Sequence, residues 1–486
     1  MSLEGLPPSL RRIHLIGICG TGMGALAGLL CDAGYEVTGS DRAVYPPMCD
    51  QLRGRGIAVM EGFDASHLDP APDLVIVGNI ATRDNPEARS AADRGIPFLS
   101  MPQAIARLFL AGRHPMVVGG THGKTSTAAL LSWVLSAAGR DPSFLVGGVL
   151  CNFDRSCGLG SGDEFVIEGD EYETAYFDKG SKFFHYQPRT AIVTSVEFDH
   201  AEMFADLKAV DRAFRHFVGL LPPDGLLVLC ADDANALRLR ETARCPVETY
   251  GVAPDAVWRA EVHSTDEAGT IFEVIRGNEP LGPFFSPMCG LQNVRNALAV
   301  IAAASSRGLG MPVVREGMRT FRGIKRRQEV RGIADGVIVI DDFAHHPTAV
   351  RLTLAGIRAR YAGRPLWAVF EPRTNTSRRN VFQQEYAASF DAADYVVIAA
   401  VDHAERVPPA ERFSGERLVA DLQSRGRGAR HVPGVPAIVD LLRRELRGDA
   451  VVVVMSNGAF GGIHDLLLEA LRQRSSRRSL PESTRT

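Results

Sequence analysis

The chain has 486 residues, of which 45% are hydrophobic and 23% are charged, a composition typical of soluble globular proteins. At roughly 150 residues per domain, this length predicts about three domains. The 54 basic and 57 acidic residues leave a net charge of −3, so no overall field attracts nucleic acid or an anionic membrane. With no leader pattern, no long apolar run and eight scattered cysteines, we expect a cytoplasmic protein with reduced thiols that binds neither partner.

Residues 1–112 predict a Rossmann-like α/β domain. Expected strands lie at 13–17, 35–39 and 73–79. Strands that alternate with helices and glycine turns indicate a parallel, doubly wound sheet. Gly20, Gly22 and Gly24 would let the backbone approach a diphosphate, and Asp41 lies where an acid meets a ribose hydroxyl. This region alone suggests NAD as the ligand, while a tight turn without a ligand is the alternative.

Residues 113–325 contain the most specific motif, GGTHGKTSTA at 119–128. A short apolar strand precedes it and a helix-forming run follows. In that context the backbone N–H groups at the helix N-terminus face an anion, Lys124 adds positive charge, and the Thr125 hydroxyl can reach Mg²⁺. Val118 stands where the commonest phosphate loop has glycine. A tight turn that happens to contain Gly and Lys is the alternative.

Three further apolar runs in this segment, 165–171, 190–200 and 225–233, end in polar groups. They indicate buried strands that deliver side chains to one edge of a parallel sheet. The candidate metal and nucleotide ligands at these ends are Glu168, Asp170, Glu171, Asp199 and His200. Each alone would more often be a cap or a surface charge; with the phosphate loop they favour a metal and nucleotide site. Residues 255–280 suggest an antiparallel excursion, and 293–304 a helix.

Residues 326–474 predict a separate α/β domain, with strands at 336–341, 366–370, 395–399 and 450–455. VIDDFAHHPTA at 339–349 and EPRTNTS at 371–377 place acids, histidines and Arg373 where strands end. Arg373 is suited to a carboxylate or phosphate, although an N-cap and turn is the alternative for each motif. Residues 475–486 are polar, so we expect a disordered tail rather than a basic nucleic-acid arm.

Six motifs in order, GTHGKTS, IEGDE, SVEFDH, GLQNVRN, IKRR and DDFAHHPTA, resemble the Mur ligase family over the chain up to about residue 470. YPPM, GNIATRDNP, DKGSKFFHYQPRTAI, EFDHAEMF and EPRTNTS are similar to members that accept a peptide rather than L-alanine. The resemblance implies an ATP- and Mg²⁺-dependent ligase. It would phosphorylate the carboxylate of UDP-N-acetylmuramate, and the amine of L-alanyl-γ-D-glutamyl-meso-diaminopimelate would attack the acyl phosphate, in peptidoglycan recycling.

The resemblance also implies a role for each domain: the first holds the UDP-sugar instead of NAD, the second Mg-ATP, and the third the peptide. The implied UDP-sugar contacts are Gly20, Thr21, Gly22, Met23, Gly24, Ser40 and Asp41. The implied ATP contacts are Gly120, Thr121, His122, Gly123, Lys124, Thr125, Ser126, Asn293, Asn296 and Asp342. The implied metal ligands are Thr125, Glu168 and His200, and the implied catalytic residues are Lys124, His200, His345 and Arg373.

Three positions depart from the family pattern. Gln292 replaces a usual histidine, and Ser195 replaces a common asparagine. Phe214, Arg215 and His216 occupy the region where several relatives carry a carbamylated lysine, so we expect none here. The L-alanine ligase, an NAD-dependent oxidoreductase and a non-catalytic nucleotide-switched scaffold are the alternative functions.

Overall fold

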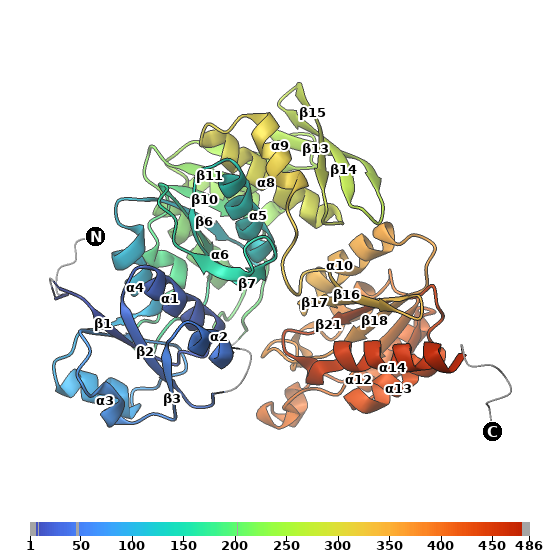
Figure 1. Ribbon diagram of the computed structural model, residues 1–486. Coiled ribbons are helices and arrows are strands. Elements are labelled where there is room, and N and C mark those ends of the chain that lie inside the picture. The colour runs from blue at the N-terminus through green and yellow to red at the C-terminus, as the bar shows by residue number, and fades with distance from the viewer. Residues whose placement is uncertain (1–5, 8, 45–47, 202, 479–486) are drawn as a thin grey trace.

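The computed structural model describes residues 6–7, 9–44, 48–201 and 203–478. Three separate β-sheets of five, ten and six strands follow one another along the chain. The central domain (green to yellow) lies between the N-terminal domain (blue) and the C-terminal domain (orange to red) (Figure 1). The predicted three-domain α/β class is confirmed, and the boundaries at 112/113 and 325/326 stay predictions. Among the described helices, none combines the length and apolar character needed to cross a membrane.

The N-terminal sheet is entirely parallel, with the Rossmann-like order β3-β2-β1-β4-β5. Its elements are β1 (Arg12–Ile16), α1 (Thr21–Asp32), β2 (Glu36–Asp41), α2 (Met48–Gly54), β3 (Ala58–Glu61), β4 (Leu74–Val77), α3 (Pro86–Asp93), β5 (Phe98–Ser100) and α4 (Met101–Ile105). The three predicted strands all form. β1 ends at the glycine turn because Gly17 has a φ of +83°, which favours glycine.

The central sheet carries the phosphate loop. Its strands are β6 (His114–Gly119), β7 (Ser143–Leu150), β8 (Arg155–Gly158), β9 (Glu164–Gly169), β10 (Thr190–Val193), β11 (Leu226–Cys230), β12 (Val247–Gly251), β13 (Trp258–Thr265), β14 (Thr270–Arg276) and β15 (Glu279–Ser286). Their order is β15-β14-β13-β12-β11-β10-β6-β9-β7-β8. β6 lies between β9 and β10, parallel to both. β13 to β15 are antiparallel, which confirms the predicted excursion.

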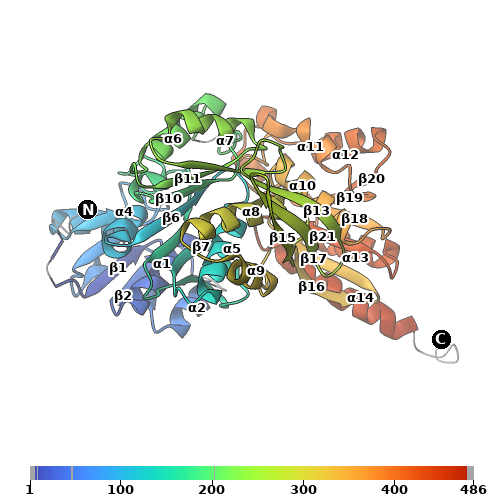
Figure 2. The same ribbon diagram turned by 90° about the horizontal axis from the view of Figure 1, so that it is seen from above.

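Helices cover this sheet and place its loops. They are α5 (Lys124–Ala137), α6 (Leu207–Gly219), α7 (Ala234–Arg238), α8 (Leu291–Ser306) and α9 (Met311–Arg319). α5 and α8 pack side by side on one face (Figure 2), and their small and aliphatic residues are almost fully buried. This packing brings the start of α8 to the phosphate loop at the start of α5.

The C-terminal sheet has the order β16-β17-β21-β18-β19-β20 and is parallel except for β16. Its elements are β16 (Glu329–Ala334), β17 (Val337–Asp342), α10 (Pro347–Arg360), β18 (Leu366–Phe370), α11 (Glu385–Ser389), β19 (Tyr395–Ile398), α12 (Gly415–Ser424), β20 (Gly428–His431), α13 (Val435–Glu445), β21 (Val451–Met455) and α14 (Ile463–Arg478). All four predicted strands form.

The predicted disordered tail, 475–486, is corrected at its start, because α14 continues to Arg478. The helix is anchored where Arg474 pairs with Asp335 at 2.6 Å and donates to the carbonyls of Arg443 and Leu446. Such a fixed guanidinium extends order toward the end of the chain. Residues 479–486 lie outside the described residues.

The first two domains share one hydrophobic core. A single cluster of buried side chains continues from β1 and α1 through α4 into β9, β10 and α6. The Ser100 hydroxyl also donates to Asp178 of the central domain at 2.6 Å. The C-terminal domain instead packs its described apolar residues into two clusters of its own.

Candidate active site

The phosphate loop connects β6 to α5 and is shaped by two glycines with positive φ. Gly120 has a φ of +136°, and a Cβ there would lie 2.0 Å from the Thr194 hydroxyl oxygen. Gly123 has a φ of +84°, and its Cβ would lie 2.7 Å from Asn296 Oδ1. A side chain at either position would need both a rare backbone conformation and space already filled. Glycine at these positions therefore lets the loop pack closely against Thr194 and Asn296, and its contact with a phosphate stays a prediction.

The segment after β10, residues 195–197, supports this loop through hydrogen bonds. Ser195 accepts a hydrogen bond from the His122 N–H at 3.0 Å through its hydroxyl, and from the Thr121 N–H at 2.9 Å through its carbonyl. The Thr121 hydroxyl accepts from the Glu197 N–H at 2.8 Å. Ser195 thus supports the loop with its shorter side chain, which gives this departure from the family pattern a structural role.

Lys124 and His200 meet through a buried carboxylate, Glu171. The Lys124 Nζ lies 2.9 Å from Glu171 Oε2 and also donates to the Gly120 carbonyl at 2.6 Å. The His200 Nε2 lies 3.5 Å from Glu171 Oε1. Burial alone would lower the pKa of Lys124, but the neighbouring carboxylates, Glu171 first, raise it above its usual value. Lys124 is therefore cationic at neutral pH, as phosphate binding requires.

Thr125 and Glu168, two of the three predicted metal ligands, lie within hydrogen-bond distance of each other. The Thr125 hydroxyl donates to Glu168 Oε2 at 3.1 Å, and the Arg327 guanidinium donates to the same hydroxyl at 3.2 Å. Burial raises the pKa of Glu168, and the nearby Asp170 adds to that rise. Such crowded acids and a hydroxyl are hard oxygen donors suited to Mg²⁺, and a divalent cation would offset their repulsion.

The first prediction concerns these ligands. We expect Glu168→Gln and His200→Ala each to raise the Mg²⁺ concentration for half-maximal phosphate release by about tenfold or more, because each removes a direct ligand. Mg²⁺ titrations at saturating substrates measure the effect. Asp224→Asn, which breaks only the exposed ion pair with Arg189, serves as control. An unchanged Mg²⁺ dependence in both variants would make the two residues structural.

The residues predicted to face the nucleoside already make hydrogen bonds within the protein. Asn293 donates to the Cys289 carbonyl at 2.8 Å, and Asn296 donates to Asn293 Oδ1 at 3.3 Å. Asp342 accepts from the N–H groups of Gln328 and Ala344, each at 2.8 Å. Asn296 borders the phosphate loop. Asp342 is buried and fixes backbone N–H groups near the start of the third domain. Their contacts with adenine and ribose stay predictions.

His345 approaches the central domain through the acids after β10. It is half-buried, and desolvation lowers its pKa while Asp199 opposes that shift. Asp199 in turn accepts a hydrogen bond from the Thr376 hydroxyl of the C-terminal domain at 3.1 Å. His345 is thus a neutral imidazole near the edge of the central sheet where its parallel strands have their carboxyl ends. His200 lies at the same edge, and the resemblance implies that the reaction takes place there.

Arg373 lies farther out in the C-terminal domain. Its guanidinium is half exposed, 3.9 Å from Glu371 and 3.7 Å from Asp402. A Cβ on Gly458 would lie 2.3 Å from its Nε, so only glycine at that position leaves room for the Arg373 side chain. The half-exposed fork is available to an acidic ligand, but the structure does not bring it into the group formed by Lys124, Glu171 and His200.

The predicted UDP-sugar loop combines open and buried positions. Gly20 and Thr21 are exposed and Gly22 is half-buried, whereas Met23 and Gly24 face the interior. Asp41 accepts a hydrogen bond from the Cys19 N–H at 2.8 Å and so orders the glycine turn. Ser40 is fully buried, with its hydroxyl bonded to Glu87. The exposed glycine backbone fits a diphosphate, and the UDP-sugar contacts stay predictions.

Residues that the sequence did not single out complete the site. Thr194 bonds the loop carbonyls of Gly119 and His122, Arg327 reaches Thr125, and Glu197 accepts from the Thr348 hydroxyl at 2.7 Å. The only sequence signal was their position inside the SVEFDH, IKRR and AHHPTA motifs or, for Thr194, directly before SVEFDH, because contacts between distant segments leave no local pattern.

Comparison with known families covers all three domains. Residues 12–113 match the Mur ligase family catalytic domain, 118–304 the Mur ligase middle domain, and 326–458 the Mur ligase glutamate ligase domain. The chain is 41% identical to the UDP-N-acetylmuramate–L-alanyl-γ-D-glutamyl-meso-2,6-diaminoheptandioate ligase of Escherichia coli (strain K12), covering 96% of this chain and 99% of that protein. It is 34% identical to the UDP-N-acetylmuramate–L-alanine ligase of Salinibacter ruber, covering 92% of each.

A solved structure gives the same assignment. The crystal structure of a murein peptide ligase from Psychrobacter arcticus 273-4 is similar with a TM-score of 0.72 and 37% identity, covering 95% of this chain and 99% of that one. The resemblance inferred from the six motifs is confirmed, and the match covers the phosphate loop, the carboxylates after β9 and the AHHPTA turn. The chain is an enzyme that belongs to the Mur ligase family.

Proposed function

We propose that this enzyme joins UDP-N-acetylmuramate to L-alanyl-γ-D-glutamyl-meso-diaminopimelate in an ATP- and Mg²⁺-dependent reaction of peptidoglycan recycling. The observation that carries this proposal is the 41% identity, over nearly the whole of both chains, to the E. coli ligase named for these substrates. The site supports it independently, because Lys124, Thr125 and Glu168 supply a cation and hard oxygen donors at a glycine loop. These are the groups that phosphoryl transfer requires.

The chemistry starts from a carboxylate, which is a poor electrophile at neutral pH. Phosphorylation by ATP would convert it into an acyl phosphate with a good leaving group, and the amine of the peptide would then displace phosphate. The loop N–H groups and Lys124 would stabilise the charge that develops on the transferred phosphate. Thr125, Glu168 and His200 would hold Mg²⁺, which neutralises phosphate charge when bound. His345 and Arg373 would orient the acceptor from the third domain.

The acceptor distinguishes this function from that of the L-alanine ligases. We expect ATP and UDP-N-acetylmuramate to give phosphate release that L-alanyl-γ-D-glutamyl-meso-diaminopimelate stimulates far more than free L-alanine does. The tripeptide carries several carboxylates, and such groups gain most from the planar fork of an arginine. A phosphate-release assay with a panel of amines measures this. Equal or better stimulation by L-alanine would move the assignment to the alanine-adding ligase.

Arg373→Lys tests the proposed contact within the same assay. Lysine keeps the positive charge but loses the planar fork, so we expect the KM for the tripeptide to rise by about tenfold, while the KM for ATP stays unchanged. Arg379→Lys, whose guanidinium pairs with Glu411 at the surface, is the matched control. If Arg373→Lys leaves the tripeptide KM at its wild-type value, another group holds the acceptor.

The alternatives outside the family have little support. An NAD-dependent oxidoreductase would have no use for the paired Lys124, and the first domain matches a Mur ligase domain rather than a dehydrogenase. A non-catalytic scaffold would not need the half-buried His345 beside the acids after β10. Binding of NADH without binding of a UDP-sugar, measured by calorimetry, would contradict the proposed ligase.

A further inference from the structure

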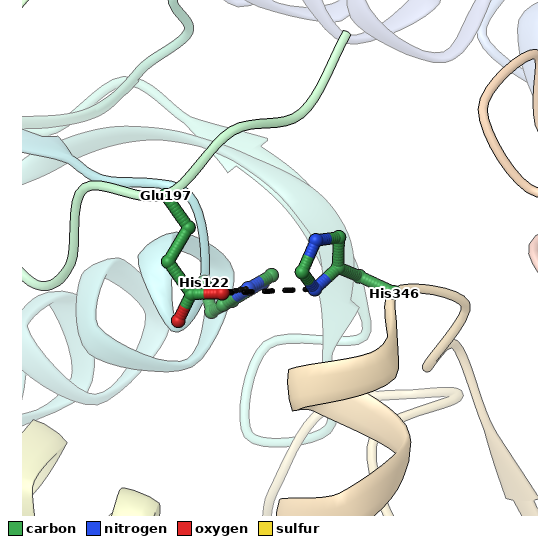
Figure 3. Close-up of side chains that lie close together, drawn as sticks. All are labelled: His122, Glu197 and His346. Carbon is green, nitrogen blue, oxygen red and sulfur yellow. Dashed lines mark ion pairs between the residues drawn. The ribbon is translucent and has the colours of Figure 1, made fainter. Parts of the chain in front are cut away.

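Two imidazoles and a carboxylate meet where the phosphate loop contacts the C-terminal domain (Figure 3). His122 belongs to the loop, Glu197 follows β10, and His346 precedes α10. The His122 Nε2 lies 3.5 Å from Glu197 Oε2, and the His346 Nδ1 lies 3.8 Å from the same oxygen. One ligand atom from each residue lies within 4.8 Å of the other two. This trio is separate from the predicted Mg²⁺ ligands Thr125, Glu168 and His200.

Hydrogen bonds satisfy only part of the trio, because His346 Nδ1 accepts from the Thr348 N–H at 3.2 Å while one nitrogen of each imidazole has no hydrogen-bond partner in the described part of the chain. The Nε2 atoms of His122 and His346 are buried without a hydrogen-bond partner among the described residues, although buried polar groups are normally paired. His346 is only 5% exposed. The carboxylate, in contrast, is well supported, because the Thr348 hydroxyl donates to Glu197 Oε2 at 2.7 Å. A fixed carboxylate next to unsatisfied imidazoles is typical of a site that binds an additional group.

The protonation states fit a metal ion. Burial lowers the pKa of His346 to about 4, and the nearby His122 contributes, so this ring is neutral at pH 7. Burial disfavours the Glu197 carboxylate, yet His122, the Thr348 hydroxyl and His346 lower its pKa to about 2. A neutral imidazole and an ionised carboxylate are the forms that ligate metals.

We propose that His122, Glu197 and His346 form a site for a divalent transition-metal ion of the Zn²⁺ class, which fastens the phosphate loop to the C-terminal domain. Two imidazoles and one carboxylate are a ligand set that Zn²⁺ uses with a fourth position left open. Bond lengths of about 2.0–2.1 Å place tetrahedral ligand atoms about 3.3 Å apart, and the two nitrogen–carboxylate separations here are 3.5 and 3.8 Å. Mg²⁺ prefers oxygen ligands, so a site with two imidazoles favours an ion of the Zn²⁺ class over Mg²⁺.

Because the ligands come from two domains, the ion would act on their relative position. His122 moves with the phosphate loop, whereas His346 is the N-cap of α10, where its Nδ1 accepts a hydrogen bond from the Thr348 N–H at 3.2 Å. An ion bound through Nδ1 would take the place of that hydrogen bond. Binding of the ion would therefore favour the arrangement in which the third domain covers the loop. The site lies outside the proposed Mg²⁺ site, and its test does not depend on which acceptor the enzyme uses.

Co²⁺ titration of the metal-free full chain tests the site, with excess Mg²⁺ present to fill the predicted Mg²⁺ site. We expect the visible absorption bands of four-coordinate Co²⁺, lost on addition of Zn²⁺. Glu197→Gln and His346→Asn should each weaken Co²⁺ binding by at least about 100-fold, because each removes a direct ligand. Asparagine keeps an acceptor at the N-cap of α10, and circular dichroism checks the fold. His431→Gln, which removes an imidazole paired with Glu416 at 3.0 Å on the surface, should bind Co²⁺ like the wild type.

Three results would overturn the proposal. The first is a wild-type chain that shows no four-coordinate bands. The second is bands that persist unchanged in folded Glu197→Gln and His346→Asn. The third is bands that vanish in Glu168→Gln instead, since Co²⁺ would then occupy the predicted Mg²⁺ site.

Discussion

Lys124→Ala lowers phosphate release by at least about 10³-fold, because it removes the charge-assisted contact to the transferred phosphate in a buried site. Steady-state assays with ATP, UDP-N-acetylmuramate and the tripeptide measure this loss. The variant also loses stability, since Lys124 is the ion-pair partner of buried Glu171, 2.9 Å away. A buried charge left without its partner costs about 3–5 kcal/mol, which thermal or urea unfolding detects.

The double variant Lys124→Met/Glu171→Gln separates catalysis from folding. It replaces both charges with neutral groups of similar size, so we expect most of the lost stability to return. Phosphate release should stay low, because the cation is still absent. A double variant that regained both stability and activity would show that Lys124 has only a structural role in the loop.

Gly123→Ala raises the Kd for ATP by about 10²-fold, which calorimetric titration measures. The residue has a φ of +84°, and the new Cβ would lie 2.7 Å from Asn296 Oδ1. An alanine held in this left-handed conformation costs on the order of 1–3 kcal/mol, and the contact adds to that cost. The loop would relieve both by moving, and its N–H groups would then miss the phosphates.

Gly139→Ala is the matched control for this substitution. Gly139 follows α5 with a φ of +73°, and a Cβ there would meet no atom within 4 Å. We expect a loss of about 1 kcal/mol in unfolding free energy from the backbone alone, with the Kd for ATP unchanged. If Gly123→Ala binds ATP as tightly as Gly139→Ala does, the phosphate loop does not cradle the nucleotide in this conformation.

The buried strands that end in glycine or acidic residues could be predicted from the sequence alone. β1, β6, β17 and β21 are short apolar runs whose ends are marked by glycine or acids, so both their position and their chemistry could be predicted. The edge strand β16 was missed because it is half exposed and mixes charged with apolar residues. The short strands β3 and β5 have too few residues to show a period.

Contacts between segments far apart in the chain could not be predicted from the sequence. The position of Glu171 between Lys124 and His200 left no local signal. The hydrogen bond from the Cys19 N–H to Asp41 was not expected either, and the predicted ligand contacts of both acids stay predictions. Glu197 and His346 lie about 150 residues apart, and only the packing of the third domain against the loop joins them. Local patterns carry no information about such pairs.

The hydrophobic core that continues from β1 through α6 has a thermodynamic consequence. Because the N-terminal and central domains bury the same side chains, neither can expose its share without exposing the other's, and the two form one cooperative unit. The C-terminal domain keeps its own clusters and meets its neighbour through polar groups such as Thr348, Thr376 and Arg327, an interface that favours relative motion. Heat capacity scans should therefore resolve two transitions rather than three. The transition with the larger enthalpy should belong to the N-terminal and central domains together.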